Sequence, residues 1–325
     1  MRKVCVTGAY GFIGQSLCQA LIKSNISVRG AVRSLTSLSS LDKVEYVSVG
    51  SINAETNWRD ALVDSDCVIH CAGKTPATNK NKTDDLVAHY SVDVDGAKRL
   101  AEQAVEAGIK RLVFLSSVKV NGESTDGLGM FDSNKNKKKV FTYNDSPAPK
   151  DFYGVSKFEA EKVLWEVSAR TGLEVIVLRV PLVYGKGAKG NLARLLKLLR
   201  YGVPLPFGAV HNQRSLIGLD NLVDLLIRCI DHPSATGKTF LVSDGEDLST
   251  QDLLRLIASA LGRSLLMFPV PVSLLKLVSR IIGIDNEMNR LLGSLRIDSS
   301  YTRETLNWKP SVSVAEGIRR MVQQK

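Results

Sequence analysis

The stretch Thr7-Gly8-Ala9-Tyr10-Gly11-Phe12-Ile13-Gly14 lies between a strand-like run and a helix-like pattern. In a strand–turn–helix unit of this kind, Gly8 allows the chain to turn tightly as it leaves the strand. Gly11 has no Cβ and so allows the backbone to approach a phosphate closely, and Gly14 allows the helix to pack closely against the sheet. The helix N-terminus adds unpaired amides and the positive end of a dipole, which suit an anion. The spacing therefore predicts a site for a dinucleotide pyrophosphate, and the alternative is a glycine-rich structural turn. The residues expected to contact the dinucleotide are Gly8, Tyr10, Gly11, Phe12, Ile13 and Gly14.

Short apolar runs alternate with helical patterns along the first half of the chain. Helical periodicity covers Ile13–Lys23, Val92–Gly108 and Tyr153–Thr171. Near-continuous apolar strands between such helices are typical of a parallel sheet that is buried on both faces. The strand-like runs are Val4–Thr7, Val28–Val32, Val44–Val49, Cys67–Cys71, Leu112–Leu115 and Val175–Arg179. The predicted fold class is therefore α/β, a Rossmann-like doubly wound parallel sheet with a smaller mixed C-terminal substrate lobe.

The rhythm of strands and helices changes after residue 180, which indicates a second unit. We expect a dinucleotide-binding Rossmann domain with the catalytic residues over residues 1–180. Residues 181–325 are expected to be mainly a substrate-binding lobe, with part of the chain returning to the sheet. Within this lobe, Val272–Gly283 is predicted to be a helix packed on its neighbours, because globular helices commonly carry such an apolar pattern. The alternative is a helix that lies on a membrane.

The composition limits the class of protein. With 325 residues, 44% of them hydrophobic, the chain can bury a substantial core, and no apolar run approaches the length of a membrane span. We therefore expect a cytoplasmic protein without an integral membrane segment. Five scattered cysteines without a histidine cluster predict reduced thiols and no metal site. The net charge of +10 is partly concentrated in four lysines of a polar segment, where a solvated loop is expected rather than a nucleic-acid surface: Lys135, Lys137, Lys138 and Lys139.

The end of the second strand helps to identify the dinucleotide. An acidic residue at this point would bind the ribose hydroxyls of NAD, but Val28–Ser34 contains none. Arg33 stands where a guanidinium could clamp a 2′-phosphate. The segment therefore favours NADP, with NAD as the alternative. The alternative role for Arg33 is that of a solvated surface cation.

Three residues have the character of a redox site. Tyr153 and Lys157 are four residues apart and so share one helix face, where the ammonium would lower the phenol's pKa. Such a phenol can exchange a proton with a substrate oxygen while hydride moves to or from a nicotinamide ring. Ser117 ends the fifth strand, at the sheet edge where ligands bind. It is expected to polarise the reacting carbonyl, although a strand-capping role is the alternative.

The chain resembles the extended short-chain dehydrogenase/reductase superfamily, of the NAD-dependent epimerase/dehydratase type. The resemblance lies in the glycine turn, the serine at the strand end and the Tyr-Lys pair, which occur in the same order as in that superfamily. The resemblance covers nearly the whole chain. It includes Val68-Ile69-His70-Cys71-Ala72-Gly73 and Arg179-Val180-Pro181-Leu182-Val183-Tyr184-Gly185. The residues that it implies as further cofactor contacts, beside Tyr153 and Lys157, are Cys71, Ala72, Gly73 and Val180.

Within the superfamily the chain is similar to bacterial UDP-sugar 4-epimerases and 4-ketoreductases of surface-polysaccharide pathways. The similarity lies in Lys119-Val120-Asn121-Gly122-Glu123, Gly190-Asn191 and Arg214-Ser215-Leu216. It implies that Asn191 and Arg214 hold the nucleotide diphosphate, and helix starts and guanidinium groups do favour anions. The residues expected to bind the UDP-sugar are Ser117, Lys119, Asn191, Phe207, Arg214 and Arg290. Ordinary helix capping or surface charge is the alternative for the polar ones.

Three positions depart from the family pattern. Asp93 stands where the family usually has Asn, and a carboxylate cannot donate a hydrogen bond as the amide does. Ser51 replaces an acidic adenine contact, and Asn121 stands where the epimerases often carry tyrosine. These departures weaken a simple glucose/galactose epimerase assignment more than they weaken the fold.

These features together favour an NADPH-dependent oxidoreductase that reduces the C4 keto group of a UDP-4-keto-6-deoxy-N-acetylhexosamine. Arg33 decides this preference, because an epimerase recycles its cofactor internally and gains nothing from the NADPH pool. One alternative is a UDP-hexose or UDP-N-acetylhexosamine 4-epimerase with tightly bound NAD. Another is a non-catalytic NADP-sensing regulator on the same fold. A homodimer and a lipid-linked sugar substrate are compatible with the sequence.

Overall fold

The structure is a computed structural model that describes residues 2–35, 43–74, 82–126 and 140–323. Lys135, Lys137, Lys138 and Lys139, which were predicted to lie in a solvated loop, fall outside the described residues.

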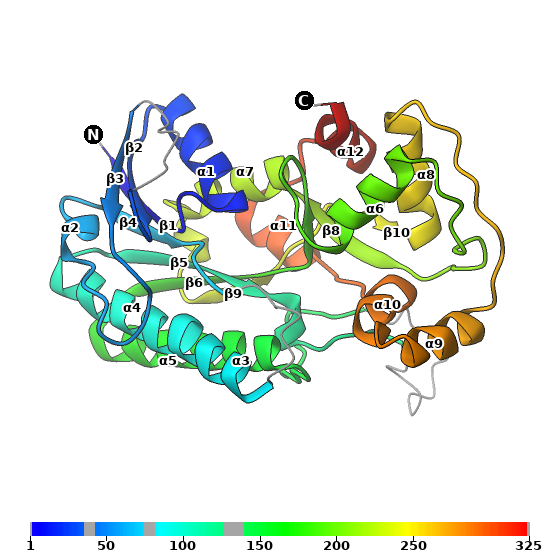
Figure 1. Ribbon diagram of the computed structural model, residues 1–325. Helices are drawn as coiled ribbons and strands as arrows, with labels where there is room; N and C mark the ends of the chain where they lie inside the picture. The colour runs from blue at the N-terminus through cyan, green and yellow to red at the C-terminus, as the bar shows by residue number, and fades with distance from the viewer. Residues whose placement is uncertain (1, 36–42, 75–81, 127–139, 324–325) are drawn as a thin grey trace.

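A parallel sheet of seven strands forms the centre of the protein (Figure 1). The strands, in spatial order, are β3 (Val44–Ser48), β2 (Ser27–Val32), β1 (Lys3–Thr7), β4 (Cys67–His70), β5 (Arg111–Ser117), β6 (Glu174–Val180) and β9 (Lys238–Leu241). The order reverses beside β1, and in doubly wound folds ligands bind at this switch point, outside the carboxyl ends of the strands. The predicted Rossmann-like fold is therefore confirmed.

Helices cover both faces of this sheet and bury alternate residues of each strand. Val4 and Val6 of β1 belong to one apolar core and Cys5 to the other. The first core includes side chains of α1 (Phe12–Lys23), α7 (Leu219–Cys229) and α11 (Ser300–Leu306). The second includes side chains of α2 (Arg59–Leu62), α4 (Gly96–Glu106) and α5 (Phe152–Thr171). Three shorter segments are α3 (Lys82–His89), the π-helical η1 (Tyr90–Asp95) and the 3-10 turn η2 (Val118–Val120).

A second lobe has its own small sheet and its own core (Figure 1). Its strands are β10 (Asp247–Leu248), β8 (Arg214–Gly218) and β7 (Leu182–Tyr184), in that order. Its helices are α6 (Asn191–Arg200), α8 (Thr250–Ala260), α9 (Val272–Ile281), α10 (Asp285–Leu292) and α12 (Val314–Gln323). The 3-10 turn η3 (Pro233–Ala235) precedes β9, which returns the chain to the large sheet. The split at residue 180 remains a prediction.

The structure corrects one expectation about helices and places another. The helix predicted within Val92–Gly108 is α4, Gly96–Glu106, and the residues before it, up to Asp95, are π-helical. Helix α9 was expected to pack its apolar side on the lobe. Instead only Leu275 and Ser279 of this helix are buried, because side chains of α6, α8 and α12 already fill much of the lobe's core.

All five cysteines are free thiols, and four of them are buried. Within the ranges that the structure describes, no helix combines the length and the apolar character that crossing a membrane requires.

Candidate active site

The glycine turn has the backbone that its sequence predicts. Gly8 has φ +63, and a Cβ there would lie 2.9 Å from the Ala72 backbone. A Cβ on Gly14 would lie 2.2 Å from the Gly8 carbonyl oxygen, so helix α1 can approach the turn only with glycine there. No side chain of the described part caps the start of α1. Its first amides are therefore available to an anion, and the turn fits a dinucleotide pyrophosphate.

A buried pair joins the glycine turn to the loop after β4. The Thr7 hydroxyl lies 2.6 Å from His70 Nδ1, and it accepts a hydrogen bond from the Ala72 amide at 3.2 Å. Burial lowers the pKa of His70 to about 3, so the imidazole is neutral. The His70 ring stacks on Phe114 with centroids 5.7 Å apart. These contacts fix the loop that carries Cys71, Ala72 and Gly73 beside the turn.

Ser117, Tyr153 and Lys157 come together at the carboxyl ends of the strands. Ser117 ends β5 and pairs in register with Val180, the last residue of β6. A hydrogen bond links Ser117 to Tyr153 in the first turn of α5. One helical turn further on, Lys157 Nζ lies 5.0 Å from the Phe114 ring centroid and 5.9 Å from that of Tyr153. The serine, phenol and ammonium therefore share one corner of the sheet.

Asp93 is the close partner of Lys157. Its Oδ1 lies 3.1 Å from Lys157 Nζ, and both side chains are buried. The other oxygen accepts a hydrogen bond from the Ser156 hydroxyl at 3.1 Å and lies 3.3 Å from His89 Nδ1. Burial raises the pKa of Asp93, but the Lys157 charge and the hydrogen bonds outweigh it and lower the pKa to about 2. A Cβ on Gly73 would lie 2.8 Å from Lys157 Nζ, so the loop backbone closes over this pair.

The ion pair changes the acidity of both catalytic candidates. Burial alone would lower the pKa of Lys157, but the charge of Asp93 reverses the effect and the pKa is raised. Burial raises the pKa of the Tyr153 phenol, and the negative charge of Asp93 raises it further. The positive charge of Lys157 and the hydrogen bond from Ser117 lower it. The carboxylate therefore keeps Lys157 protonated and offsets part of the charge that would help Tyr153 to ionise.

A second buried ion pair joins the strands and the helix that carry Ser117 and Tyr153. Arg179 on β6 forms a pair with Glu161 on α5 at 2.6 Å. Glu161 also accepts a hydrogen bond of 2.5 Å from the hydroxyl of Ser116. Arg179 reaches Asn121 at 3.1 Å. Because these bonds join β5, β6, α5 and Asn121, which directly follows η2, they fix Ser117 relative to the helix that carries Tyr153.

Lys119, a residue of η2, reaches the start of α5 and lies between two carboxylates. Its ammonium lies 2.8 Å from Glu123 and forms a second, closer ion pair with Asp151. Asp151 in turn caps α5, since its other oxygen accepts a hydrogen bond from the Gly154 amide at 2.7 Å. These contacts make Lys119 a residue that holds the catalytic helix, whereas its contact with substrate stays a prediction.

Arg214 and Arg290 place two positive charges in the second lobe. Arg214 begins β8 and donates a hydrogen bond to the Gly293 carbonyl at 2.9 Å. Burial and the nearby charge of Arg290 lower the pKa of Arg214 to about 10, while Asp126 and Glu123 oppose this. Two cations close together are unfavourable unless an anion joins them. Glu123 connects this pair to Lys119 and so to the start of α5.

Three other predicted residues lie apart from these groups. Asn191 is the first residue of α6, and no hydrogen bond or ion pair in the described part links it to Arg214. Phe207 is buried in the core of the second lobe, so a direct contact with a base stays a prediction. Arg33 is exposed just beyond β2, next to the glycine turn, because β2 pairs with β1 up to Ala31 opposite Thr7.

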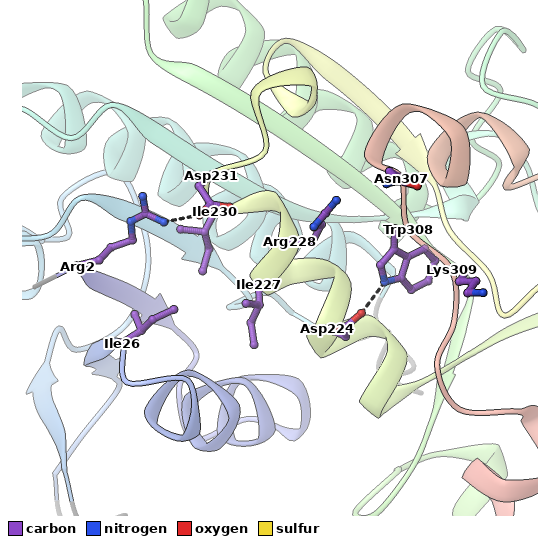
Figure 2. A pocket seen from close by; sticks show the side chains of 10 residues that line it. All are labelled: Arg2, Ile26, Asp224, Ile227, Arg228, Ile230, Asp231, Asn307, Trp308 and Lys309. Carbon is purple, nitrogen blue, oxygen red and sulfur yellow. Dashed lines mark hydrogen bonds and ion pairs between the residues drawn. The ribbon is translucent and has the colours of Figure 1, made fainter.

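Three surface pockets of the described part contain neither Ser117 nor Tyr153 nor Lys157. Figure 2 shows a pocket of about 490 Å³ near the amino ends of the strands, between Arg2, α7 and Trp308. Inside it, Arg2 pairs with Asp231 and the Trp308 indole donates a hydrogen bond to Asp224, both at 2.7 Å. A groove of about 1060 Å³ reaches the glycine turn at Tyr10–Phe12 and continues along α1. The candidate active site is therefore argued from the side-chain geometry of Ser117, Tyr153 and Lys157 and not from these pockets.

Several positioning residues escaped the sequence analysis. The role of Asp151 had a signal, because Asp directly before a helix commonly caps it. Thr7 and His70 end two strands that are adjacent only in the sheet. The Arg179–Glu161 pair had no signal, because a buried ion pair has no spacing rule between a strand and a helix.

The fold and this group of residues define a short-chain dehydrogenase/reductase of the extended type. Residues 4–243 match the NAD dependent epimerase/dehydratase family, and the chain belongs to that family.

Two relatives and one solved structure show how far the likeness extends. The chain is 39% identical over 324 residues to a UDP-glucose 4-epimerase of Vibrio cholerae, covering 99% of this chain and 95% of that protein. It is 25% identical over 276 residues to N-acetyl-alpha-D-glucosaminyl-diphospho-ditrans,octacis-undecaprenol 4-epimerase of Escherichia coli O157:H7, covering 84% and 77%. The crystal structure of UDP-glucuronic acid 4-epimerase from Bacillus cereus superimposes with a TM-score of 0.77 at 21% identity, covering 98% of both chains.

Proposed function

We propose that this protein is a nucleotide-sugar 4-epimerase that uses NAD. The observation that carries the proposal is the assembled group of Ser117, Tyr153 and Lys157 beside a dinucleotide turn, in a chain that aligns along its whole length with a UDP-glucose 4-epimerase. The 4-epimerase replaces the 4-ketoreductase as the preferred hypothesis, because the relatives named above are 4-epimerases.

The residues divide the chemistry among themselves. Bound NAD would accept hydride from C4 of the sugar and return it to the opposite face. Tyr153 takes the proton of the C4 hydroxyl as the hydride leaves, and gives it back when the carbonyl is reduced again. Ser117 donates a hydrogen bond to the same oxygen, and the charge of Lys157 stabilises the phenolate.

The second lobe would hold the diphosphate while the sugar turns. Arg214 and Arg290 present two neighbouring cations, and the charges of Asp126 and Glu123 offset the effect on Arg214 only in part; a diphosphate would supply further negative charge. We propose a nucleotide diphosphate, with a lipid-linked diphosphate sugar as the alternative in the same position.

The test is an assay without added reductant. The purified protein is incubated with UDP-glucose, UDP-N-acetylglucosamine or UDP-glucuronic acid, and the C4 epimer is measured by nuclear magnetic resonance. Mass spectrometry of the released cofactor then identifies the dinucleotide. We expect tightly held NAD and interconversion of one epimer pair. Absence of interconversion with all three sugars would contradict a nucleotide-sugar 4-epimerase.

The 4-ketoreductase remains a second candidate because Arg33 is exposed at the end of β2, where a 2′-phosphate could be bound. If it is right, a UDP-4-keto-6-deoxy-N-acetylhexosamine consumes one NADPH per turnover. In that case Arg33→Ala weakens NADP binding and leaves NAD binding unchanged. Equal effects on both dinucleotides indicate that Arg33 is a surface cation.

A further inference from the structure

Helix α9 turns its apolar side chains away from the protein. Leu274, Leu277, Val278 and Ile281 recur at the spacing of one helix face and are between 46% and 76% exposed. The opposite face carries the buried Leu275 and Ser279. In a helix that serves only the core of a globular domain, the apolar stripe faces inward. Here it faces outward.

Further exposed apolar residues flank the helix in the sequence. Ile282 and Ile284 follow α9 directly, and Leu266 and Phe268 lie in the segment before it; all four are exposed. Figure 1 shows α9 at the outer edge of the second lobe, with α10 beside it. Single exposed apolar residues are ordinary, but a grouped set of this size marks an interaction surface.

Positive charges flank the stripe. Lys276 and Arg280 are four residues apart on the polar side of α9, and both are exposed. Neither forms an ion pair with any residue in the part of the chain that the structure describes. An apolar stripe beside unpaired cations matches the chemistry of an anionic bilayer surface, where acyl chains receive the stripe and headgroups the cations.

We propose that α9 docks the protein on an anionic phospholipid bilayer, with Leu277 and Ile281 inserted at the level of the headgroups. Its ten residues are too few to cross a bilayer. A second copy of the chain could cover the stripe, whereas an anionic bilayer both covers the stripe and supplies anions to Lys276 and Arg280. The inference stands on this surface and does not rest on the proposed function.

Docking would also orient the candidate diphosphate site. Gly283 and Ile284 connect α9 to α10, and α10 carries Arg290, whose charge acts on Arg214. The two arginines are therefore one short helix away from the docked surface.

The experiment measures sedimentation of the full chain with lipid vesicles. One set contains phosphatidylcholine and phosphatidylglycerol, the other phosphatidylcholine alone, each at low and high salt. We expect binding to the anionic vesicles that weakens at high salt. Leu277→Ser and Ile281→Ser should each weaken it about tenfold, and Lys276→Glu about fivefold or more. Val63→Ser, at a residue 46% exposed in the other domain, should bind like the wild type.

Three outcomes overturn the proposal. They are no binding of the wild type to anionic vesicles, equal binding by all variants, and a wild-type dimer that Ile281→Ser converts to a monomer. The last outcome would assign the stripe to a second copy. Thermal melting and activity on a dissolved nucleotide sugar should match the wild type and show that the variants fold. If the serine variants melt early, Lys276→Glu carries the test alone.

Discussion

Asp93 Oδ1 lies 3.1 Å from the ammonium of Lys157, and the pair is buried beside the phenol of Tyr153. The sequence marked Asp93 as a departure that could not donate like the usual Asn. The structure gives it a partner, since Lys157 is the donor that a carboxylate needs. The same pair decides how readily Tyr153 ionises, because the two charges act on its pKa in opposite directions.

Replacing Asp93 by Asn should make Tyr153 more acidic. Without the carboxylate, one of the influences that oppose the Lys157 charge is lost, so the Tyr153 pKa falls. The acid limb of kcat/KM should move to lower pH by about one unit. Asp95→Asn, at an exposed residue of the same segment, is the matched control. An unmoved acid limb in Asp93→Asn, with the protein folded, contradicts this account of the ion pair.

The Asp93 pair should also make the fold acid-sensitive. The Asp93 pKa is lowered from 3.8 to about 2, so its contribution to stability is complete above pH 4 and is lost as the pH falls towards 2. The shift corresponds to about 2 kcal/mol. Urea unfolding at several pH values measures it. The wild type's advantage over Asp93→Asn should shrink in this window, and a constant difference would count against the assignment.

Tyr153→Phe should remove catalysis and preserve the fold. Only the hydroxyl is lost, and a positioned acid–base group contributes about 100- to 10,000-fold to the rate. We expect kcat to fall within that range while the bound dinucleotide is retained. Tyr90→Phe, at a half-exposed tyrosine of η1, controls for loss of a phenol. If Tyr153→Phe keeps full cellular function, the non-catalytic regulator becomes the better explanation.

Glu161→Gln should destabilise the protein strongly. The substitution leaves Arg179 buried without its carboxylate, which costs about 3–5 kcal/mol. Glu159→Gln on the same helix breaks the exposed pair with Lys162 and should cost less than about 1 kcal/mol. Denaturant unfolding of both variants compares the two costs directly. Similar costs would mean that the buried network does not hold α5 to the strands.

Gly14→Ala should disturb the turn itself. Its Cβ would lie 2.2 Å from the Gly8 oxygen, so α1 must move away, at a cost of about 1–3 kcal/mol or more. Dinucleotide affinity should fall with stability, because we propose that the same amides bind the pyrophosphate. Ser16→Ala in the next turn of α1 is the control. Normal dinucleotide affinity in Gly14→Ala would remove the turn from the cofactor site.

Sequence patterns predicted those parts of the fold that depend on residues close together along the chain. The large sheet and its covering helices follow from short apolar runs and helical periodicity, and the strand ends place Ser117 at the ligand edge. The small sheet was not expected. Its strands, such as Leu182–Tyr184, are two to five residues long, and such short runs have too little pattern to separate them from loops.

The sequence by itself determined the glycine turn, the parallel sheet and the shared helix face of Tyr153 and Lys157, because each follows from spacing within one element. Only the tertiary structure decided that Asp93 binds Lys157, that Arg179 binds Glu161 and that the stripe of α9 faces outward. These depend on which elements meet. Contacts between elements distant in sequence are set by packing of the whole chain, and no local spacing encodes them.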